Sequence, residues 1–208
     1  MKCLIIGAGN LNTKQIIIQK DDFIICADGG YIYTKELKIK PNLIVGDFDS
    51  LNEEIKDIEI IKYSKEKKET DTYLAILEGI KRGYHDFVLY GCLGGRLEHT
   101  IANLQIMAKL IRKGVSIELV DDDTYIKLLK RHDQAGVNAH FNGYISLFSF
   151  SRFSNVSIKG LKYPINHYTL SSHFPLGIDN EATDEEGTIK IHHGLVLLII
   201  SKKREENK

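Results

Sequence analysis

The sequence predicts an α/β domain with a parallel sheet, followed by a small all-β module. In the first half, short apolar runs alternate with amphipathic helical patterns, which favours a parallel sheet wrapped by helices. Several of the runs are continuously apolar, as expected for strands covered on both faces. From about Tyr125, short segments are separated by Gly, Asn, Asp and Ser, and no helical stripe exceeds two turns. We place the domains at residues 1–130 and 131–208.

Six apolar runs of the first domain predict its strands, and two amphipathic stretches predict its longer helices. The helices are expected at about Thr70 to Arg82 and Leu97 to Lys113, because a glycine, Gly83 or Gly114, follows each apolar stripe. The predicted strands are Cys3 to Ile6, Phe23 to Ala27, Leu43 to Val45, Ile58 to Tyr63, Phe87 to Tyr90 and Ser116 to Val120.

The second domain shows four strand-like segments without intervening helices. They are Tyr144 to Phe150, Val156 to Leu161, Thr188 to His192 and Leu195 to Ser201. The polar, glycine-containing stretch 131–142 precedes them, so the domain boundary lies close to it.

The composition excludes several classes of protein. Lys plus Arg and Asp plus Glu both number 28, so no net positive charge draws the chain to nucleic acid or an anionic membrane. The longest late apolar run, Leu195 to Ile200, is far shorter than the roughly 20 residues of a membrane span. The N-terminal apolar run is too short for a signal peptide, so we expect a cytoplasmic protein. The zero net charge also favours self-association.

The three cysteines, Cys3, Cys26 and Cys92, are far apart and lie in apolar runs. An odd number without CxxC spacing argues against a disulfide framework and against a zinc site. We expect buried, reduced thiols at the ends of strands.

The segment Gly46-Asp47-Phe48-Asp49-Ser50 follows an apolar run and presents two carboxylates two residues apart. Ligands of α/β proteins bind beyond the carboxyl ends of the strands. Side chains at i and i+2 leaving a strand point the same way, so Asp47 and Asp49 can meet one hard cation, and Mg²⁺ prefers such oxygen ligands. The alternative is an acidic turn that caps a following helix at 51–55.

Two further aspartates follow the same logic. Asp28 precedes Gly29-Gly30 at the end of an apolar strand, where glycines let the backbone approach an anion closely or simply form a tight turn. Asp71 follows Thr70, a plausible helix cap, so it is either a site carboxylate or only a favourable charge at a helix N-terminus.

The segment from Gly91 to His99 combines a glycine-rich turn, an arginine and a helix start. Gly94-Gly95-Arg96 therefore predicts a phosphate cradle, because backbone N–H groups and a guanidinium both bind phosphate oxygens. The segment is neither a Walker loop nor a dinucleotide-binding fingerprint. His99 alone is more often a structural histidine. Together, the aspartates and this cradle predict a magnesium-dependent enzyme acting on a polyphosphate such as ATP.

These motifs, in this order, resemble the thiamine pyrophosphokinase family over nearly the whole chain. The matching segments are Ala27-Asp28-Gly29-Gly30, Gly46-Asp47-Phe48-Asp49-Ser50, Glu69-Thr70-Asp71, Gly94-Gly95-Arg96-Leu97-Glu98-His99, Gly160-Leu161-Lys162-Tyr163-Pro164, Gly177-Ile178-Asp179-Asn180-Glu181 and Gly194-Leu195-Val196.

The resemblance implies an N-terminal Rossmann-like domain, a C-terminal β-sandwich that binds thiamine and forms the dimer, and a homodimer with thiamine near the subunit interface. It implies transfer of the pyrophosphoryl group of ATP to the thiamine hydroxyl, with AMP as the other product. The implied residues are Asp47, Asp49 and Asp71 for Mg²⁺, the same three with Arg96 for catalysis, Asp28, Gly29, Gly30, Gly94, Gly95, Arg96 and His99 for ATP, and Asp71, Asp179 and Asn180 for thiamine.

The sequence departs from the family pattern at a few positions. Lys68 stands where an acidic residue is usual, Glu98 replaces an aspartate, and Asp179 replaces a common serine. These differences concern thiamine recognition more than ATP chemistry.

Three other functions remain open from the residues. A phosphatase-like enzyme would use Asp47 as nucleophile and Asp49 as acid and base. A pyrophosphokinase could act on another alcohol, such as a pterin. A nucleotide sensor would bind ATP without turnover.

Overall fold

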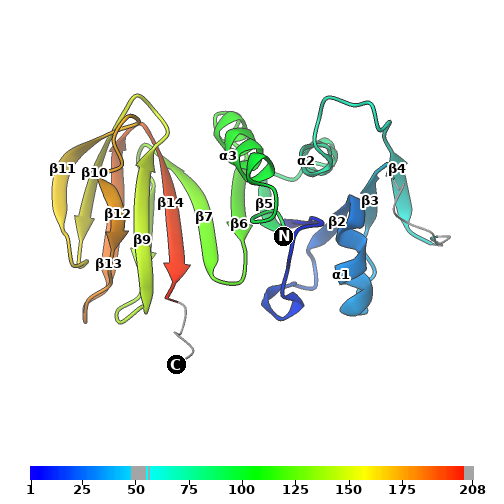
Figure 1. The fold of residues 1–208 in the computed structure, drawn as a ribbon, viewed down its shortest axis with the longest axis horizontal. Coiled ribbons are helices and arrows are strands. Elements are labelled where there is room, and N and C mark those ends of the chain that lie inside the picture. The colour runs from blue at the N-terminus through cyan, green and yellow to red at the C-terminus, as the bar shows by residue number, and fades with distance from the viewer. Residues whose placement is uncertain (48–54, 56, 204–208) are drawn as a thin grey trace. The chain divides into compact units, whose positions relative to one another are not determined.

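The computed structural model describes residues 1–47, 55 and 57–203, and the chain divides into two compact units, 1–122 and 123–208 (Figure 1). The sequence predicts the domain boundary after residue 130, eight residues later than in the structure. The strand Thr124–Lys130 therefore belongs to the second unit, not to the first as predicted. In the part of the chain that the structure describes, no helix is long and apolar enough to cross a membrane.

The first unit is a parallel sheet with helices on both faces. Within the described residues of this unit, six strands run in the order β6-β5-β1-β2-β3-β4, and every neighbouring pair is parallel. The strands are β1 Cys3–Ile6, β2 Phe23–Ala27, β3 Leu43–Gly46, β4 Glu59–Lys62, β5 Asp86–Tyr90 and β6 Ser116–Val120. The α-helices are α1 Tyr31–Glu36, α2 Asp71–Lys81 and α3 Leu97–Ile111, with short 3-10 turns at Thr13–Gln15 and Asp28–Gly30.

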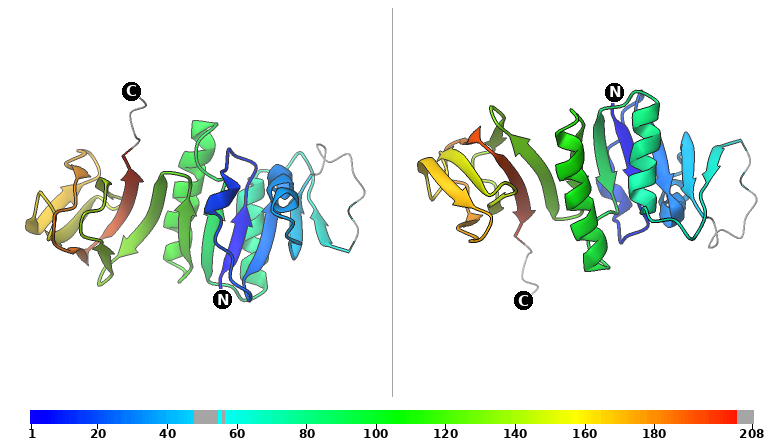
Figure 2. Two further views of the ribbon diagram at one scale, coloured as in Figure 1. Left: turned by 90° about the horizontal axis from the view of Figure 1, so that it is seen from below. Right: turned by 90° about the horizontal axis from the view of Figure 1, so that it is seen from above.

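Side-chain alternation explains why both faces of this sheet are apolar. Leu4 and Ile6 of β1 join a cluster on one face, against which Tyr33 of α1 packs. Cys3 and Phe87 lie on the other face, against Gly79 of α2. Figure 2 shows α2 and α3 together on one face of the sheet and α1 on the opposite face. Because helices cover both faces, β1 is buried at all four of its residues, as its continuous apolar run predicts.

The strand order places a switch point between β1 and β5. The chain first adds β2, β3 and β4 on one side of β1, then returns to add β5 and β6 on the other side. The loops after β1 and β5 therefore leave the carboxyl edge of the sheet in opposite directions, and this is where ligands bind in open α/β sheets.

The second unit consists of antiparallel strands in two groups, β12-β9-β14-β7 and β11-β10-β13-β8. The strands are β7 Thr124–Lys130, β8 Gln134–Val137, β9 Gly143–Ser149, β10 Phe153–Lys159, β11 Ile165–Ser171, β12 Gly177–Asn180, β13 Gly187–His193 and β14 Leu195–Lys202. One buried apolar cluster draws side chains from both groups, among them Ile145, Leu147 and Val196 from the first and Val156 and Ile191 from the second. Burial of this cluster holds the two groups together.

The predicted strands of the first domain and its two longer helices are confirmed, as are the four strands predicted for the second domain. The sequence patterns do not predict α1, β7, β8, β11 and β12. Helix α1 has only six residues, and β8 and β12 have four each, too short for a clear period. Most residues of β11 are exposed, so that strand carries little apolar signal. All three cysteines are buried and free of disulfides, as expected.

A polar network joins the end of α2 to the edge strand β4. The Glu78 carboxylate accepts hydrogen bonds from the Tyr63 hydroxyl at 2.7 Å, the Lys81 ammonium at 2.6 Å and the Arg82 guanidinium at 2.8 Å. Arg82 also pairs with Glu59 of β4. Burial by itself raises the pKa of Glu78, but the hydrogen bonds outweigh burial and lower this pKa to about 2.

The change Glu78→Gln should therefore destabilise the fold in a pH-dependent way. The folded pKa lies below the ordinary 4.5, so the ionised carboxylate stabilises the fold above pH 4.5, and this contribution is lost as the pH falls toward about 2. We expect the variant to lose about 2 kcal/mol of unfolding free energy near neutral pH and much less near pH ~3, as measured by urea unfolding. An equal loss at both pH values would contradict the role of the charge.

Candidate functional site

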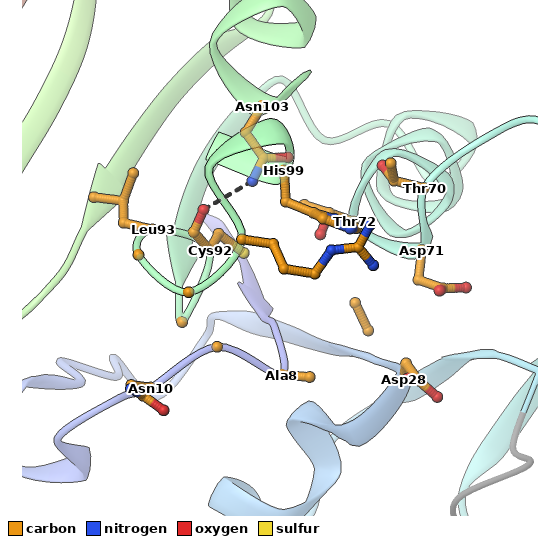
Figure 3. Close-up of a pocket in the computed structure, with 16 residues that line it drawn as sticks. Ala8, Asn10, Asp28, Thr70, Asp71, Thr72, Cys92, Leu93, His99 and Asn103 are labelled. Carbon is orange, nitrogen blue, oxygen red and sulfur yellow. Dashed lines mark hydrogen bonds between the residues drawn. The ribbon is translucent and has the colours of Figure 1, made fainter. Parts of the chain in front are cut away.

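A cavity of about 360 Å³ lies at the carboxyl edge of the parallel sheet, where the loops after β1, β2 and β5 meet the first turns of α2 and α3 (Figure 3). All of its lining residues belong to the first unit. They are Ala8, Gly9, Asn10, Ala27, Asp28, Thr70, Asp71, Thr72, Gly91, Cys92, Leu93, Gly94, Gly95, Arg96, His99 and Asn103. The cavity thus lies at the switch point of the sheet.

The loops after β1 and β5 are hydrogen-bonded to each other at the base of the cavity. The N–H of Gly7 donates to the Tyr90 carbonyl at 2.8 Å, and the N–H of Gly9 donates to the Gly91 carbonyl at 2.9 Å. A Cβ atom at Gly9 would lie 2.6 Å from the Gly91 oxygen, so only glycine allows this approach. The Tyr33 hydroxyl of α1 donates to the Gly9 carbonyl at 2.7 Å and so ties the loop after β1 to this helix.

The turn before α3 has the properties of an anion cradle. Gly94 and Gly95 have φ angles of 71° and 62°, and a Cβ at either would meet no atom within 4 Å, so their backbone faces open space. Arg96 occupies the N-cap position of α3 and makes no side-chain cap hydrogen bond, so the positive end of the helix dipole faces this turn without a capping oxygen. The exposed Arg96 guanidinium pairs with Glu98 at 2.6 Å, a contact between two exposed groups that a phosphate can readily replace.

Asn103 holds this turn in place from α3. Its side chain is buried, and its amide donates to the Cys92 carbonyl at 2.8 Å (Figure 3). The Cys92 thiol itself is buried, and burial raises its pKa to about 12, so it is no nucleophile at neutral pH.

Asp28 lies at the end of β2 in a left-handed conformation, with φ 48°. Its Oδ1 atom is buried and is the one buried side-chain N or O atom without a hydrogen-bond partner in the described part of the chain. Burial raises the pKa of Asp28; the Gly29 N–H lowers it, and the charges of Asp71 and Asp47 raise it further. A buried carboxylate oxygen with an open lone pair beside two other acids is a position for a cation.

Asp71 is the first residue of α2, and the hydroxyl of Thr70 caps this helix by accepting from the Tyr73 N–H at 3.2 Å. The Asp71 carboxylate pairs with the ammonium of Lys67, from the segment that precedes the helix. Figure 3 shows Asp71 and Asp28 on one side of the cavity and Asn103 on the other.

The structure brings most of the predicted ATP-site residues together. Asp28, Asp71, Gly94, Gly95, Arg96 and His99 all line the one cavity. Asp47 lies near enough for its charge to act on Asp28. Gly29 and Gly30 form the 3-10 turn after β2 but do not line the cavity. Asp49 lies outside the described residues. Among the residues that the structure does describe, no group of three or more acids, histidines or cysteines forms a ready metal site.

Of the three residues predicted for thiamine, Asp71 lines the cavity of the first unit, and Asp179 and Asn180 belong to β12 in the second unit. Asn180 is buried, and its side-chain amide accepts from the Tyr163 N–H at 3.0 Å and donates to the Tyr163 carbonyl at 2.9 Å. Asp179 is exposed, with φ 58°, and its N–H donates to Ser146. In this structure the Asn180 amide ties the end of β12 to the connection between β10 and β11, and Asp179 is exposed.

Sequence reasoning missed several residues of the cavity: Ala8, Gly9, Asn10, Thr72 and Asn103. The pair Gly7 and Gly9 directly after a buried strand was an available signal, because closely spaced glycines at a strand end mark a close backbone approach. Asn103 gave no such signal, since a polar residue within a helical stripe reveals its partner only when the fold is known.

Comparisons with known proteins follow the same division of the chain. Residues 14–119 match the family model of the thiamin pyrophosphokinase catalytic domain, and residues 125–196 match that of the thiamin pyrophosphokinase vitamin B1 binding domain. The thiamine pyrophosphokinase of Bacillus subtilis is 30% identical over 186 residues, which cover 85% of this chain and 86% of that protein.

Solved structures agree on the fold. The crystal structure of the Bacillus subtilis thiamine pyrophosphokinase aligns with a TM-score of 0.87 at 23% identity, covering 98% of this chain and 100% of that one. That of a probable thiamine pyrophosphokinase from Staphylococcus saprophyticus aligns with a TM-score of 0.74 at 30% identity, over the same shares of the two chains, 98% and 100%.

The change Asn103→Leu should loosen the turn between β5 and α3. It leaves the buried Cys92 carbonyl without a donor, so we expect a loss of about 1–3 kcal/mol in the free energy of unfolding and weaker binding of inorganic pyrophosphate. Urea unfolding and calorimetry measure the two effects. Gln105→Leu, an exposed change on the same helix, should leave both nearly unchanged. Unaltered pyrophosphate binding in Asn103→Leu would show that Asn103 does not position the turn.

Proposed function

The chain belongs to the thiamine pyrophosphokinase family, and we propose that it transfers the pyrophosphoryl group of ATP to the hydroxyl group of thiamine, giving thiamine diphosphate and AMP. The observation that carries this proposal is the cavity that unites Asp28 and Asp71 with the Gly94-Gly95-Arg96 turn. Acids on one side and anion-binding groups on another are what a metal–polyphosphate complex requires.

The residues present fit a magnesium ion. Asp28 Oδ1 is a buried oxygen without a donor, and Asp71 and Asp47 are close enough to act on it electrostatically. We propose that Asp47, Asp71 and Asp49 hold Mg²⁺, with Asp28 beside them. Such an ion supplies neutralisation of the negative charge on the phosphates.

The protein groups position the reactants around this centre. The guanidinium of Arg96 and the N–H groups at the start of α3 would bind the polyphosphate, with His99 beside them. The thiamine oxygen then forms a bond to the β-phosphorus, the bond from that phosphorus to the α-phosphate oxygen breaks, and the hydroxyl proton is released. This step needs in-line placement and charge neutralisation rather than a protein nucleophile.

The second unit is proposed to bind thiamine and to form a homodimer, with Asp179 in the thiamine site. Exposed apolar side chains support an interface there, since Phe174, Leu176, Ile178 and Tyr163 are each 45–63% exposed in one chain. We also propose that the two units are a Rossmann-like domain and a β-sandwich. The free cysteines fit a cytoplasmic location.

The proposal predicts AMP as the nucleotide product. Incubation with ATP, Mg²⁺ and thiamine, followed by separation of the nucleotides, should give AMP only when thiamine is present. Release of ADP or free phosphate would favour a phosphatase-like enzyme, AMP formed only with another alcohol would change the acceptor, and ATP binding without turnover would indicate a sensor.

The changes Asp47→Asn and Asp71→Asn should each lower turnover by at least about a hundredfold, because each removes a charged oxygen ligand from the metal–polyphosphate complex. Initial rates of AMP formation measure the loss, and thermal unfolding verifies that the fold survives. Asp86→Asn is a matched control, because Asp86 begins β5 at the opposite edge of the sheet. Near-normal rates in both site variants would refute the metal assignment.

A further inference from the structure

Lys67 is a nearly buried lysine at the edge of the candidate site. It lies in the segment between β4 and α2, and its side chain is only 13% exposed. Its ammonium pairs with the Asp71 carboxylate and lies 5.9 Å from the centre of the Tyr63 ring. A lysine buried to this extent needs a compensating negative charge, and Asp71 supplies one.

The charges around Lys67 form one cluster. The ammonium acts electrostatically on Asp28, as do the carboxylates of Asp71 and Asp47. Lys67 thus contributes a positive charge to a cluster in which the carboxylates of Asp71 and Asp47 repel that of Asp28. Removing this positive charge makes the cluster more negative and more attractive to another cation.

The stability of the helix does not account for this placement. Lys67 precedes the first turn of α2, and a positive charge near the N-terminus of a helix opposes the helix dipole. The pair also differs from an ordinary helical i,i+4 pair, because only Asp71 belongs to the helix. A lysine held there despite the dipole indicates a role toward the acids of the site.

This inference rests on the proposed function. We propose that Lys67 is an internal counter-ion of the aspartate site, which holds the Asp71 carboxylate while the site is empty and competes with the divalent cation for it. An oxygen of Asp71 that accepts from the ammonium cannot serve a small, hard cation equally well at the same time. Binding of the cation therefore displaces Lys67 from Asp71, and Lys67 sets the cation affinity of the empty enzyme.

The test measures cation binding directly, without turnover. Mn²⁺ is titrated into nucleotide-free protein, and free Mn²⁺ is quantified by electron paramagnetic resonance. Lys67→Met should bind Mn²⁺ at least about fivefold more tightly than the unchanged protein, because it removes the competing charge. Lys67→Arg keeps the charge and should stay close to the unchanged protein.

Lys68→Met is the matched control. It removes the same charge one residue away, but Lys68 is exposed and lines a separate hollow between α2 and α3 with Tyr73 and Lys109. Its Mn²⁺ affinity should change less than twofold, since exposed charges are well screened. An equal gain in Lys68→Met and Lys67→Met would reduce the effect to net charge and overturn the proposal.

Unchanged or weaker Mn²⁺ binding by folded Lys67→Met, with thermal unfolding verifying the fold, would make the pair purely structural and overturn the proposal. Should Lys67→Met not fold, Lys67→Gln serves the same comparison. Failure of the proposed function would show as a lack of AMP formation by the unchanged protein. The Mn²⁺ affinities of the variants could still be compared in that case, so the two failures are distinguishable.

Discussion

The contact between the loops after β1 and β5 is the constraint on which the rest of the site depends. Two backbone hydrogen bonds, from Gly7 and Gly9, close the switch point of the sheet, and the lack of side chains there lets the loops touch. That contact sets where the chain can go next. On one side it leads to the Gly94-Gly95-Arg96 turn before α3, and on the other it faces the end of β2, where Asp28 lies. Asp28, Asp71 and the turn before α3 share one cavity because these hydrogen bonds hold the two loops together.

The electrostatics of the site follow from this closed base. Asp28 lines the cavity, its buried Oδ1 atom has no hydrogen-bond partner, and the charges of Asp71 and Asp47 act on its carboxylate. Excess negative charge of this kind destabilises the empty protein unless cations offset it. Lys67 offsets part of it, and the proposed metal ion and the arginine of the cradle complete the balance around a polyphosphate.

The segment that carries Lys67 is anchored at both ends. At its start, Tyr63 donates to the buried Glu78 and pairs through its N–H with the Gly46 carbonyl next to Asp47. At its end, Thr70 caps α2. The Glu78 network thus has a consequence beyond stability: it fixes the strand edge from which the site lysine and one of the site acids extend. Fold and site are joined through this one helix, α2, which carries Asp71 at its beginning and Glu78 near its end.

The sequence by itself determined the class of the protein, the strands and helices with a strong apolar period, and the polar residues at strand ends. It did so because burial imposes the period, and because strand ends bear the ligands of α/β proteins. Short or exposed elements such as α1 and β12 have no such period. Only the tertiary structure decided which strand ends meet, that Gly9 and Asn103 belong to the site, and that Asn180 is occupied with Tyr163. Those facts depend on contacts between residues that are not neighbours in the chain, and such contacts leave no local pattern in the sequence.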